Sequence, residues 1–149
     1  SGGLFDVEVV GNVVAVRDGS GLIERCPECG RVIDGGQCRS HGAVEGEDDL
    51  RIKAIVDDGT GTVTAILDDE LTAAVYGGGL EQAREHARDA MDRSVVADDI
   101  RETIVGRAFR VRGSLTVDEY GANLTASTFE ERDANPAARA KTLLEEVAA

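Results

Sequence analysis

The first third of the chain alternates apolar and polar positions in a way that predicts β-strands. Residues 4–18, "LFDVEVVGNVVAVRD", are rich in β-branched side chains and are interrupted at Gly11-Asn12. They predict one long or bent strand. Residues 49–69, "DLRIKAIVDDGTGTVTAILDD", predict two strands joined by a hairpin turn at 58–61, where Asp and Gly residues favour a tight reversal.

In the second half of the chain, the spacing of apolar residues first becomes that of a helix and then returns to the alternation of a strand. The pattern predicts helices over 70–75 and 80–104, separated by three glycines at 77–79. Residues 107–133 predict two more strands, which reverse around 119–123. Asn135-Pro136 offers an N-cap and a first helical residue for a terminal helix. The resulting order is mainly β with helices, and five strands with a helix between the third and fourth match the plan of an OB-fold barrel.

The length of 149 residues fits a single domain with a core of its own. Ser1–Gly3 is typical of residues left by a recombinant expression vector, so we take 4–133 as the OB-fold domain and 134–149 as a separate C-terminal helix. The helix carries an apolar stripe at Ala140, Leu143, Leu144 and Val147, which needs a partner. No apolar run approaches the length of a membrane span, and no signal peptide is visible, so we expect a cytoplasmic protein without membrane association.

The charge is strongly acidic, with a formal net charge of -13, and only two of the 16 basic residues are lysines. One interpretation is adaptation to a salt-rich cytosol, in which closely spaced carboxylates hold water. The other is an acidic face that docks a partner. The acidic residues are scattered along the chain and do not form a tail, which favours salt adaptation.

All three cysteines lie in residues 24–42, "ERCPECGRVIDGGQCRSHG", together with one of the two histidines. The spacing is C-x2-C, eight residues, then C-x2-H, which places Cys26, Cys29, Cys38 and His41 on two tight turns. Two such turns suit a tetrahedral ion, and three thiolates with one imidazole favour zinc, one per chain. Full coordination by protein would make the site structural. A redox pair or unrelated thiols are the alternatives, and a lone C-x2-C would not exclude them.

The same stretch, "CPECGRVIDGGQCRSHG", and the following "DLRIKAIVDDGTGTVTAILDDELTAAVYG" resemble the zinc-bearing OB domain of archaeal replication protein A. The acidity favours a salt-loving archaeon. The resemblance implies a zinc ribbon inserted between barrel strands 1 and 2, with the four residues named above as its ligands. It also implies a domain that is not an enzyme, that binds single-stranded DNA and that associates with other subunits of a replication protein A-like complex.

The candidate nucleic-acid contacts are four cations on two predicted strands and one aromatic residue in a loop. Arg110 and Arg112 have the opposite parity to their apolar neighbours, and Arg51 and Lys53 do likewise on the other strand. They predict a phosphate track, or ordinary exposed strand faces paired with nearby acids. Tyr120, in the loop between the last two strands, is expected either to stack on a base or to pack over its hairpin.

Three functions remain open from the sequence alone. The first is single-stranded DNA binding within a replication protein A-like complex. The second is an RNA-associated scaffold of the exosome kind, and the third is a pure assembly module that uses the terminal helix and the ribbon. An enzyme is the poorest interpretation, because no nucleophile, base and oxyanion donor come together in the pattern.

Overall fold

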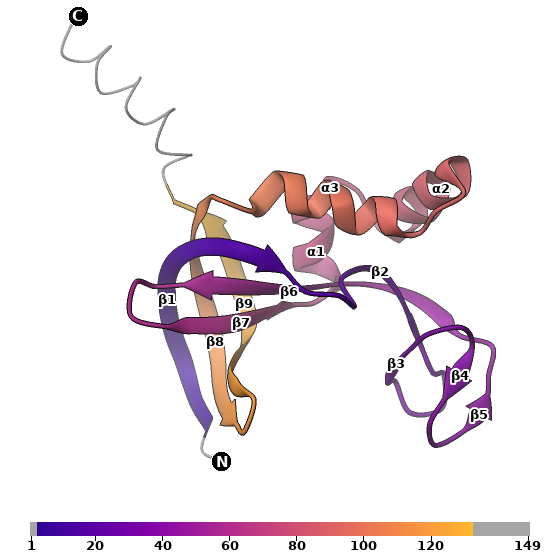
Figure 1. Cartoon of the computed structure of the whole chain (residues 1–149), viewed down its shortest axis with the longest axis horizontal. Helices are drawn as coiled ribbons and strands as arrows, with labels where there is room; N and C mark the ends of the chain where they lie inside the picture. The colour runs from indigo at the N-terminus through magenta and orange to yellow at the C-terminus, as the bar shows by residue number, and fades with distance from the viewer. Residues whose placement is uncertain (1–2, 133–149) are drawn as a thin grey trace, which may run out of the picture.

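The computed structural model describes residues 3–132. The predicted C-terminal helix at 134–149 therefore lies outside the described residues. Within them the chain forms a large β-sheet, three helices and a small two-stranded sheet (Figure 1). The fold is mainly β with helices, as the sequence predicted.

Five long strands form a closed ring. The hydrogen-bonded order is β1-β8-β9-β7-β6, and an additional pairing of β1 with β6 joins the two ends. The strands are β1 (Gly3–Val16), β6 (Glu47–Asp57), β7 (Thr62–Leu67), β8 (Ala108–Asp118) and β9 (Gly121–Glu131). The predicted hairpin at 58–61 joins β6 and β7, and the predicted reversal near 120 joins β8 and β9.

The strand β1 closes the ring because it pairs with two partners in succession. Its first part, as far as Asn12, pairs with β8, and its last part, from Asn12 to Val16, pairs with β6. The register shifts between Val13 and Ala15 where the strand changes partner. The predicted "long or bent strand" is therefore confirmed, and its bend is the corner of the ring.

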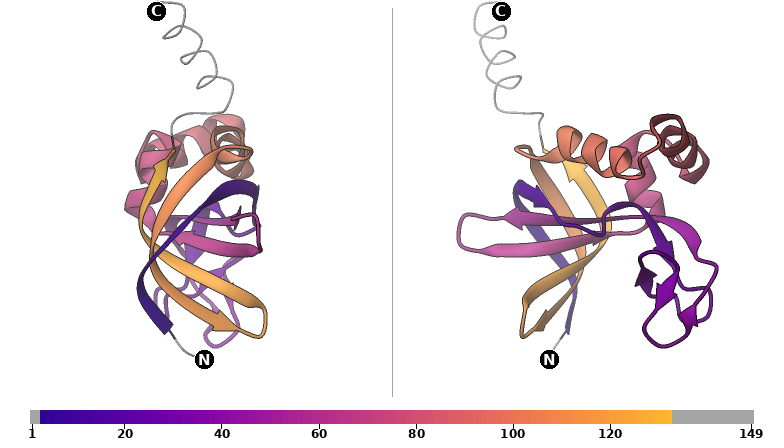
Figure 2. Two further views of the ribbon diagram at one scale, coloured as in Figure 1. Left: turned by 90° about the vertical axis from the view of Figure 1, so that its left-hand side faces the viewer. Right: turned by 45° about the vertical axis from the view of Figure 1, so that its right-hand side comes forward.

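The three helices cover one end of the ring, as Figures 1 and 2 show. They are α1 (Asp69–Tyr76), α2 (Leu80–Ala90) and α3 (Ser94–Ile104). They connect β7 to β8, and this connection allows β7 to pair in parallel with β9. The prediction of one continuous helix over 80–104 was wrong. The helix stops at Met91, whose backbone is left-handed, and Asp92 accepts hydrogen bonds from the backbone N–H and hydroxyl of Ser94 to start α3.

The core is aliphatic, as expected from a chain with 3% aromatic residues. Alternate residues of β6, namely Ile52, Ala54 and Val56, are fully buried, and Ile100 of α3 is buried with them. Among the described residues, Phe109 and Phe129 form the aromatic pair of this core, with ring centroids 4.2 Å apart.

An insertion between β1 and β6 stands to one side of the ring (Figure 1). Its first strand, β2 (Gly21–Arg25), pairs with the start of β6, and this separate strand was not predicted. The short strands β3 (Val32–Ile33), β4 (Gln37–Cys38) and β5 (Gly42–Ala43) complete it. Between β3 and β4 the chain turns at 34–36, with positive φ at Gly35 and Gly36. β4 pairs with β5, and β3 pairs with β2.

Ion pairs join the base of the insertion to the helices. The carboxylate of Asp48, on β6, lies 2.9 Å from a guanidinium nitrogen of Arg93 and 3.2 Å from one of Arg84. The next residue, Asp49, accepts a hydrogen bond of 2.6 Å from Arg25 on β2. Because Asp48 is only 18% exposed, its two arginines hold β6 against α2 and the α2–α3 turn with little competition from water.

None of the helices in residues 3–132 combines the length and the apolar character that crossing a membrane requires.

The close approach of β8 and β9 gives a test of the ring. A Cβ at Gly113, which is buried at the register shift of β8, would overlap the backbone carbonyl of Thr125. We expect Gly113→Ala to lower the free energy of unfolding by about 1–3 kcal/mol, measured by urea denaturation. Gly61→Ala is the control, because a Cβ there meets no atom within 4 Å, and it should be nearly neutral. Equal effects of the two substitutions would contradict the packing described.

Candidate metal centre and nucleic-acid interface

The four predicted metal ligands come together at the tip of the insertion. One sulfur from each cysteine and one ring nitrogen of His41 all lie within 4.8 Å of one another. The first turn is closed by hydrogen bonds between backbone groups, from Cys26 N–H to the Arg31 carbonyl and from Gly30 N–H to the Cys26 carbonyl, both 2.8 Å. Gly30 has positive φ, so the chain can reverse directly after Cys29.

The spacing of the donor atoms fits a tetrahedral ion. The Sγ atoms of Cys29 and Cys38 are 3.7 Å apart, and His41 Nδ1 lies 3.6 Å from the Sγ atoms of both Cys26 and Cys38. With metal–sulfur bonds of about 2.3 Å and metal–nitrogen bonds of about 2.0–2.1 Å, a tetrahedron has edges of about 3.7 Å and 3.6 Å. The donor set therefore fits a metal ion, which would be held by protein on all four sides.

The surroundings of two ligands favour the forms that bind a metal. The Ser40 backbone N–H, and then the His41 side chain, lower the pKa of the Cys38 thiol to about 6, toward the thiolate. The outer ring nitrogen of His41, Nε2, faces a carboxylate oxygen of Glu28 at 3.9 Å. A carboxylate that hydrogen-bonds the outer nitrogen of a ligating histidine orients the ring, and Glu28 is the nearest such group here.

The structure divides the predicted cations into two groups. Arg51 and Lys53 lie on the outer face of β6, while Arg110 and Arg112 lie on the outer face of β8, and β1 runs between these strands. Arg110 pairs with Val10 of β1, whereas Lys53 lies beside Arg17, seven residues further on. Seven residues of extended strand span on the order of 20 Å, so the two groups of cations are about that far apart along the path of the chain.

The two groups differ in how their charges are compensated. Arg110 lies 3.5 Å from Glu8, and Arg112 lies 3.7 Å from Asp6 and 4.0 Å from Glu8. In residues 3–132, by contrast, no carboxylate lies within 4.0 Å of the cationic groups of Arg51 or Lys53. The Arg51 guanidinium instead donates two hydrogen bonds to the Gly19 carbonyl, at 2.8 and 3.1 Å. The sequence gives no sign of this difference, because Asp6 and Glu8 are far from either arginine along the chain.

Arg17 joins Arg51 and Lys53, and sequence reasoning missed it. Its N–H donates to the Lys53 carbonyl, and its exposed side chain has no carboxylate within 4.0 Å in the described chain. Burial, and then the charges of Arg51 and Arg17, lower the pKa of Lys53. Burial, and then the charge of Arg25, lower the pKa of Arg51. Burial is the main cause of both shifts, neighbouring cations come second, and Asp49 opposes the shift of the Arg51 pKa. We call Arg17, Arg51 and Lys53 the cation cluster.

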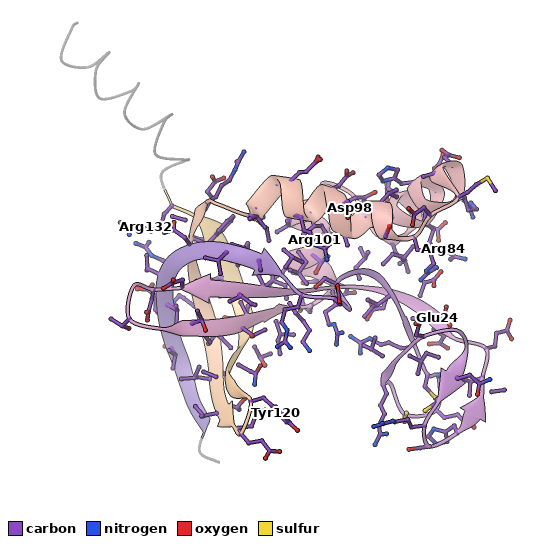
Figure 3. The ribbon with its side chains drawn as sticks, viewed as in Figure 1. Glu24, Arg84, Asp98, Arg101, Tyr120 and Arg132 are labelled. Atoms are coloured by element: carbon purple, nitrogen blue, oxygen red, sulfur yellow. The ribbon has the colours of Figure 1, made fainter. Side chains whose placement is uncertain are left out.

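A row of uncharged side chains runs from the cation cluster across the ring. Lys53 pairs with Ile66 of β7, which pairs with Thr125 of β9, and all three point away from the core. The β9 strand leads back to Tyr120, at the tip of the β8–β9 hairpin (Figure 3). The side chain of Tyr120 is 89% exposed, so its ring does not pack over the hairpin. The arrangement places cationic groups at one end and an exposed aromatic ring at the other.

No protein-family model and no curated protein matches the sequence. Comparison with solved structures finds a replication protein A heterotrimer bound to single-stranded DNA, with a TM-score of 0.58 and 14% identity over 99% of this chain. Our chain spans 36% of that chain's length. Yeast replication protein A bound to single-stranded DNA follows, with a TM-score of 0.49, 15% identity, and 99% and 86% coverage of this chain and that chain. The S. pombe Stn1-Ten1 complex has a TM-score of 0.41 and 16% identity, over 95% of this chain and 68% of that chain.

The first of these likenesses shows an OB-like fold, in agreement with the predicted fold class. The TM-scores of the other two are too low to carry an argument.

The metal centre gives a second test. We expect Cys29→Ser to weaken metal binding by more than about a hundredfold, because it removes a thiolate ligand and not an outer-shell group. Native mass spectrometry should then find one metal ion per chain in the parent and none in the variant. The ring should survive, because none of the four ligands belongs to its hydrophobic core cluster. Arg39→Ser, between two ligands but not itself a donor, should keep the ion, and loss of metal from both variants would contradict the assigned ligand set.

Proposed function

We propose that this domain binds single-stranded DNA as a subunit of a replication protein A-like complex. The observation that carries the proposal is the cation cluster: three uncompensated charges on the outer face of an acidic protein, between the insertion and the Tyr120 hairpin. The domain is a binding protein and not an enzyme. The DNA-bound state of the replication protein A neighbour supports the choice of ligand.

In this proposal the ring is a five-stranded OB barrel, with β1, β6, β7, β8 and β9 as its strands 1 to 5. The insertion is then a zinc ribbon between strands 1 and 2, and the Tyr120 turn joins strands 4 and 5. These two connections flank the oligonucleotide-binding face of an OB-fold. The zinc ion, held by the four ligands, is structural and stiffens the wall of that face.

The chemistry of the face suits a flexible polyanion. Arg17, Arg51 and Lys53 would contact phosphates, since their charges are not already used by carboxylates. Ile66 and Thr125 offer an uncharged surface for bases, and Tyr120 offers one stacking platform. A duplex would gain nothing from Tyr120, because its bases are already stacked. The face therefore favours single strands.

Few phosphate contacts also agree with the salt-adapted interpretation of the composition. Each contact to single-stranded nucleic acid contributes about -0.7 to the slope of log affinity against log salt. Three contacts give a slope near -2, which is shallow, so we infer that binding persists toward molar salt in a haloarchaeal cytoplasm. Stacking on Tyr120 is insensitive to the ionic atmosphere and would add to that persistence.

The cation cluster predicts a specific effect of substitution. We expect Arg17→Gln with Lys53→Gln to weaken single-stranded DNA binding and to make the salt slope shallower by about 1.4, which is two contacts' worth. Tyr120→Ala should instead cost about 1–3 kcal/mol of binding free energy with the slope unchanged. Fluorescence anisotropy with a labelled oligonucleotide, over a range of salt concentrations, measures both quantities.

The matched control removes the same charge elsewhere. Arg110→Gln with Arg112→Gln also deletes two cations, but these are paired with Glu8 and Asp6 and should change affinity and slope little. If the two double variants lose the same affinity, binding depends on overall charge and the cation cluster is not the site. Tighter binding of a matched RNA oligomer would favour the RNA-scaffold alternative, and no binding of either would favour a pure assembly module.

The association of subunits depends, in our proposal, on residues 134–149, which lie outside the described residues. We expect deletion of 136–149 to reduce the molar mass in light scattering to that of a monomer, because the apolar stripe of that segment would lose its partner. Single-stranded DNA binding and the thermal transition of the ring should remain. A parent protein that is already monomeric would refute this assignment.

A further inference from the structure

A groove on the molecule lies apart from the metal centre and from the cation cluster. It has a volume of about 290 Å³ and lies between α2, the α2–α3 turn and β2. Its apolar lining comes from Leu22, Ala87 and Met91. A second hollow of about 370 Å³ shares Leu22 and Arg93 with the first and continues the surface past Ile23 to β3. We call the first hollow the Met91 groove.

Met91 is unusual in two independent ways. Its side chain is 92% exposed, the most exposed of the large apolar side chains in the described chain. Its backbone is left-handed, with φ of 54°, a conformation that glycine or asparagine normally supplies at the end of a helix. A methionine here is unfavourable for the backbone and for solvation of the side chain. Local stability therefore does not explain a methionine at this position.

The rim of the Met91 groove is basic in a protein of net charge -13. Arg84 and Arg88 lie four residues apart on α2, so their side chains share one face and are separated by one helical turn. Arg93 completes the rim. Arg84 is partly engaged by Asp48 and Glu81, and Arg93 by Asp48, but Arg88 has no carboxylate within 4.0 Å in residues 3–132.

The geometry points to a protein partner: we propose that the Met91 groove binds an acidic amphipathic helix of another protein. An apolar side chain of that helix would contact Leu22, Ala87 and the flexible Met91, which adapts well to a partner's shape. Carboxylates one turn apart on the helix would match Arg84 and Arg88, in the helix-in-groove mode of recognition. DNA fits less well, because the phosphates of a nucleic acid would leave the exposed Met91 and the apolar lining of the groove without a partner.

The probe for this proposal is a synthetic peptide with leucines at i, i+3, i+4 and i+7 and glutamates at the intervening positions. The control peptide has the same composition in an order that breaks the apolar stripe. With the full chain, isothermal titration calorimetry at moderate salt should detect binding of the first peptide and not of the second. We expect Met91→Gly and Arg88→Glu each to weaken that binding about tenfold or more, as anchor and rim residues of an interface do.

Met91→Gly separates a role in binding from a role in folding. Glycine tolerates the left-handed conformation better than methionine, so this variant should unfold at the same temperature as the parent or higher, while binding is lost. Arg132→Glu makes the same charge change as Arg88→Glu on an exposed residue at the far end of β9, away from Arg84 (Figure 3), and should bind the peptide like the parent.

Several outcomes would overturn the proposal. These are equal binding of the two peptides, no binding of either, or binding that neither groove substitution changes. Loss of single-stranded DNA affinity in Arg88→Glu, with peptide binding unaffected, would assign the groove to nucleic acid. Because the Met91 groove shares no residue with the cation cluster or Tyr120, failure of this test leaves the proposed DNA binding untouched, and the reverse also holds.

Discussion

Closure of the sheet by β1 is the constraint on which the other features depend. A single strand pairs with β8 and then with β6, and the register shift between Val13 and Ala15 lets it turn from one to the other. Without that turn, β1 and β6 would lie at the two open edges of the five-strand array. With it, every long strand of the ring has a partner on both sides, and the outer face of β6 is held in a fixed position between the insertion and the β8–β9 hairpin. The cation cluster depends on this position, since Arg17 follows directly after the end of β1.

The distribution of charge matters more than its total. A net charge of -13 would repel a polyanion at long range, and most arginines in the described chain lie near a carboxylate. Among the described residues, the cations with no carboxylate within 4.0 Å are Lys53 and six arginines, namely Arg17, Arg31, Arg39, Arg51, Arg88 and Arg132. They include the cation cluster on one face and Arg88 on another. Contacts made at touching distance persist in salt that screens the distant carboxylates, because the Debye length is only about 3 Å at 1 M. An acidic protein can therefore present two small basic surfaces with different partners.

Much of the fold could be predicted from the sequence, because it rests on local signals. The alternation of apolar and polar residues predicted that Ile52 faces the core and Lys53 faces outward, and the Asp-Gly turn located the β6–β7 hairpin. The metal ligands were predictable for the same reason, since two short turns bring them together. The break after α2 was missed although Asp92 and Ser94 carry a capping signal, because a left-handed Met91 is not expected at a helix end.

Long-range pairing could not be predicted in the same way. Glu8 and Arg112 become neighbours only when β1 and β8 take their register, so the sequence alone could not separate compensated from free cations. Arg17 was overlooked because it sits at the end of a strand and outside any alternating pattern. The Met91 groove was equally invisible, since its walls come from Leu22 of β2 and from residues of α2 more than sixty positions later.

The pairing of β2 with β6 determines how far the tip of the insertion stands from the ring. The two arms stay in register from Gly21–Arg51 to Arg25–Glu47, so the base of the insertion is an antiparallel ladder that leaves and rejoins the ring at adjacent points. A ladder of this kind can lengthen by pairs of residues, each step preserving which side chains face inward. A longer or shorter pair of arms would therefore place the four Cys and His residues at a different distance from the ring, with no change of register within the ring.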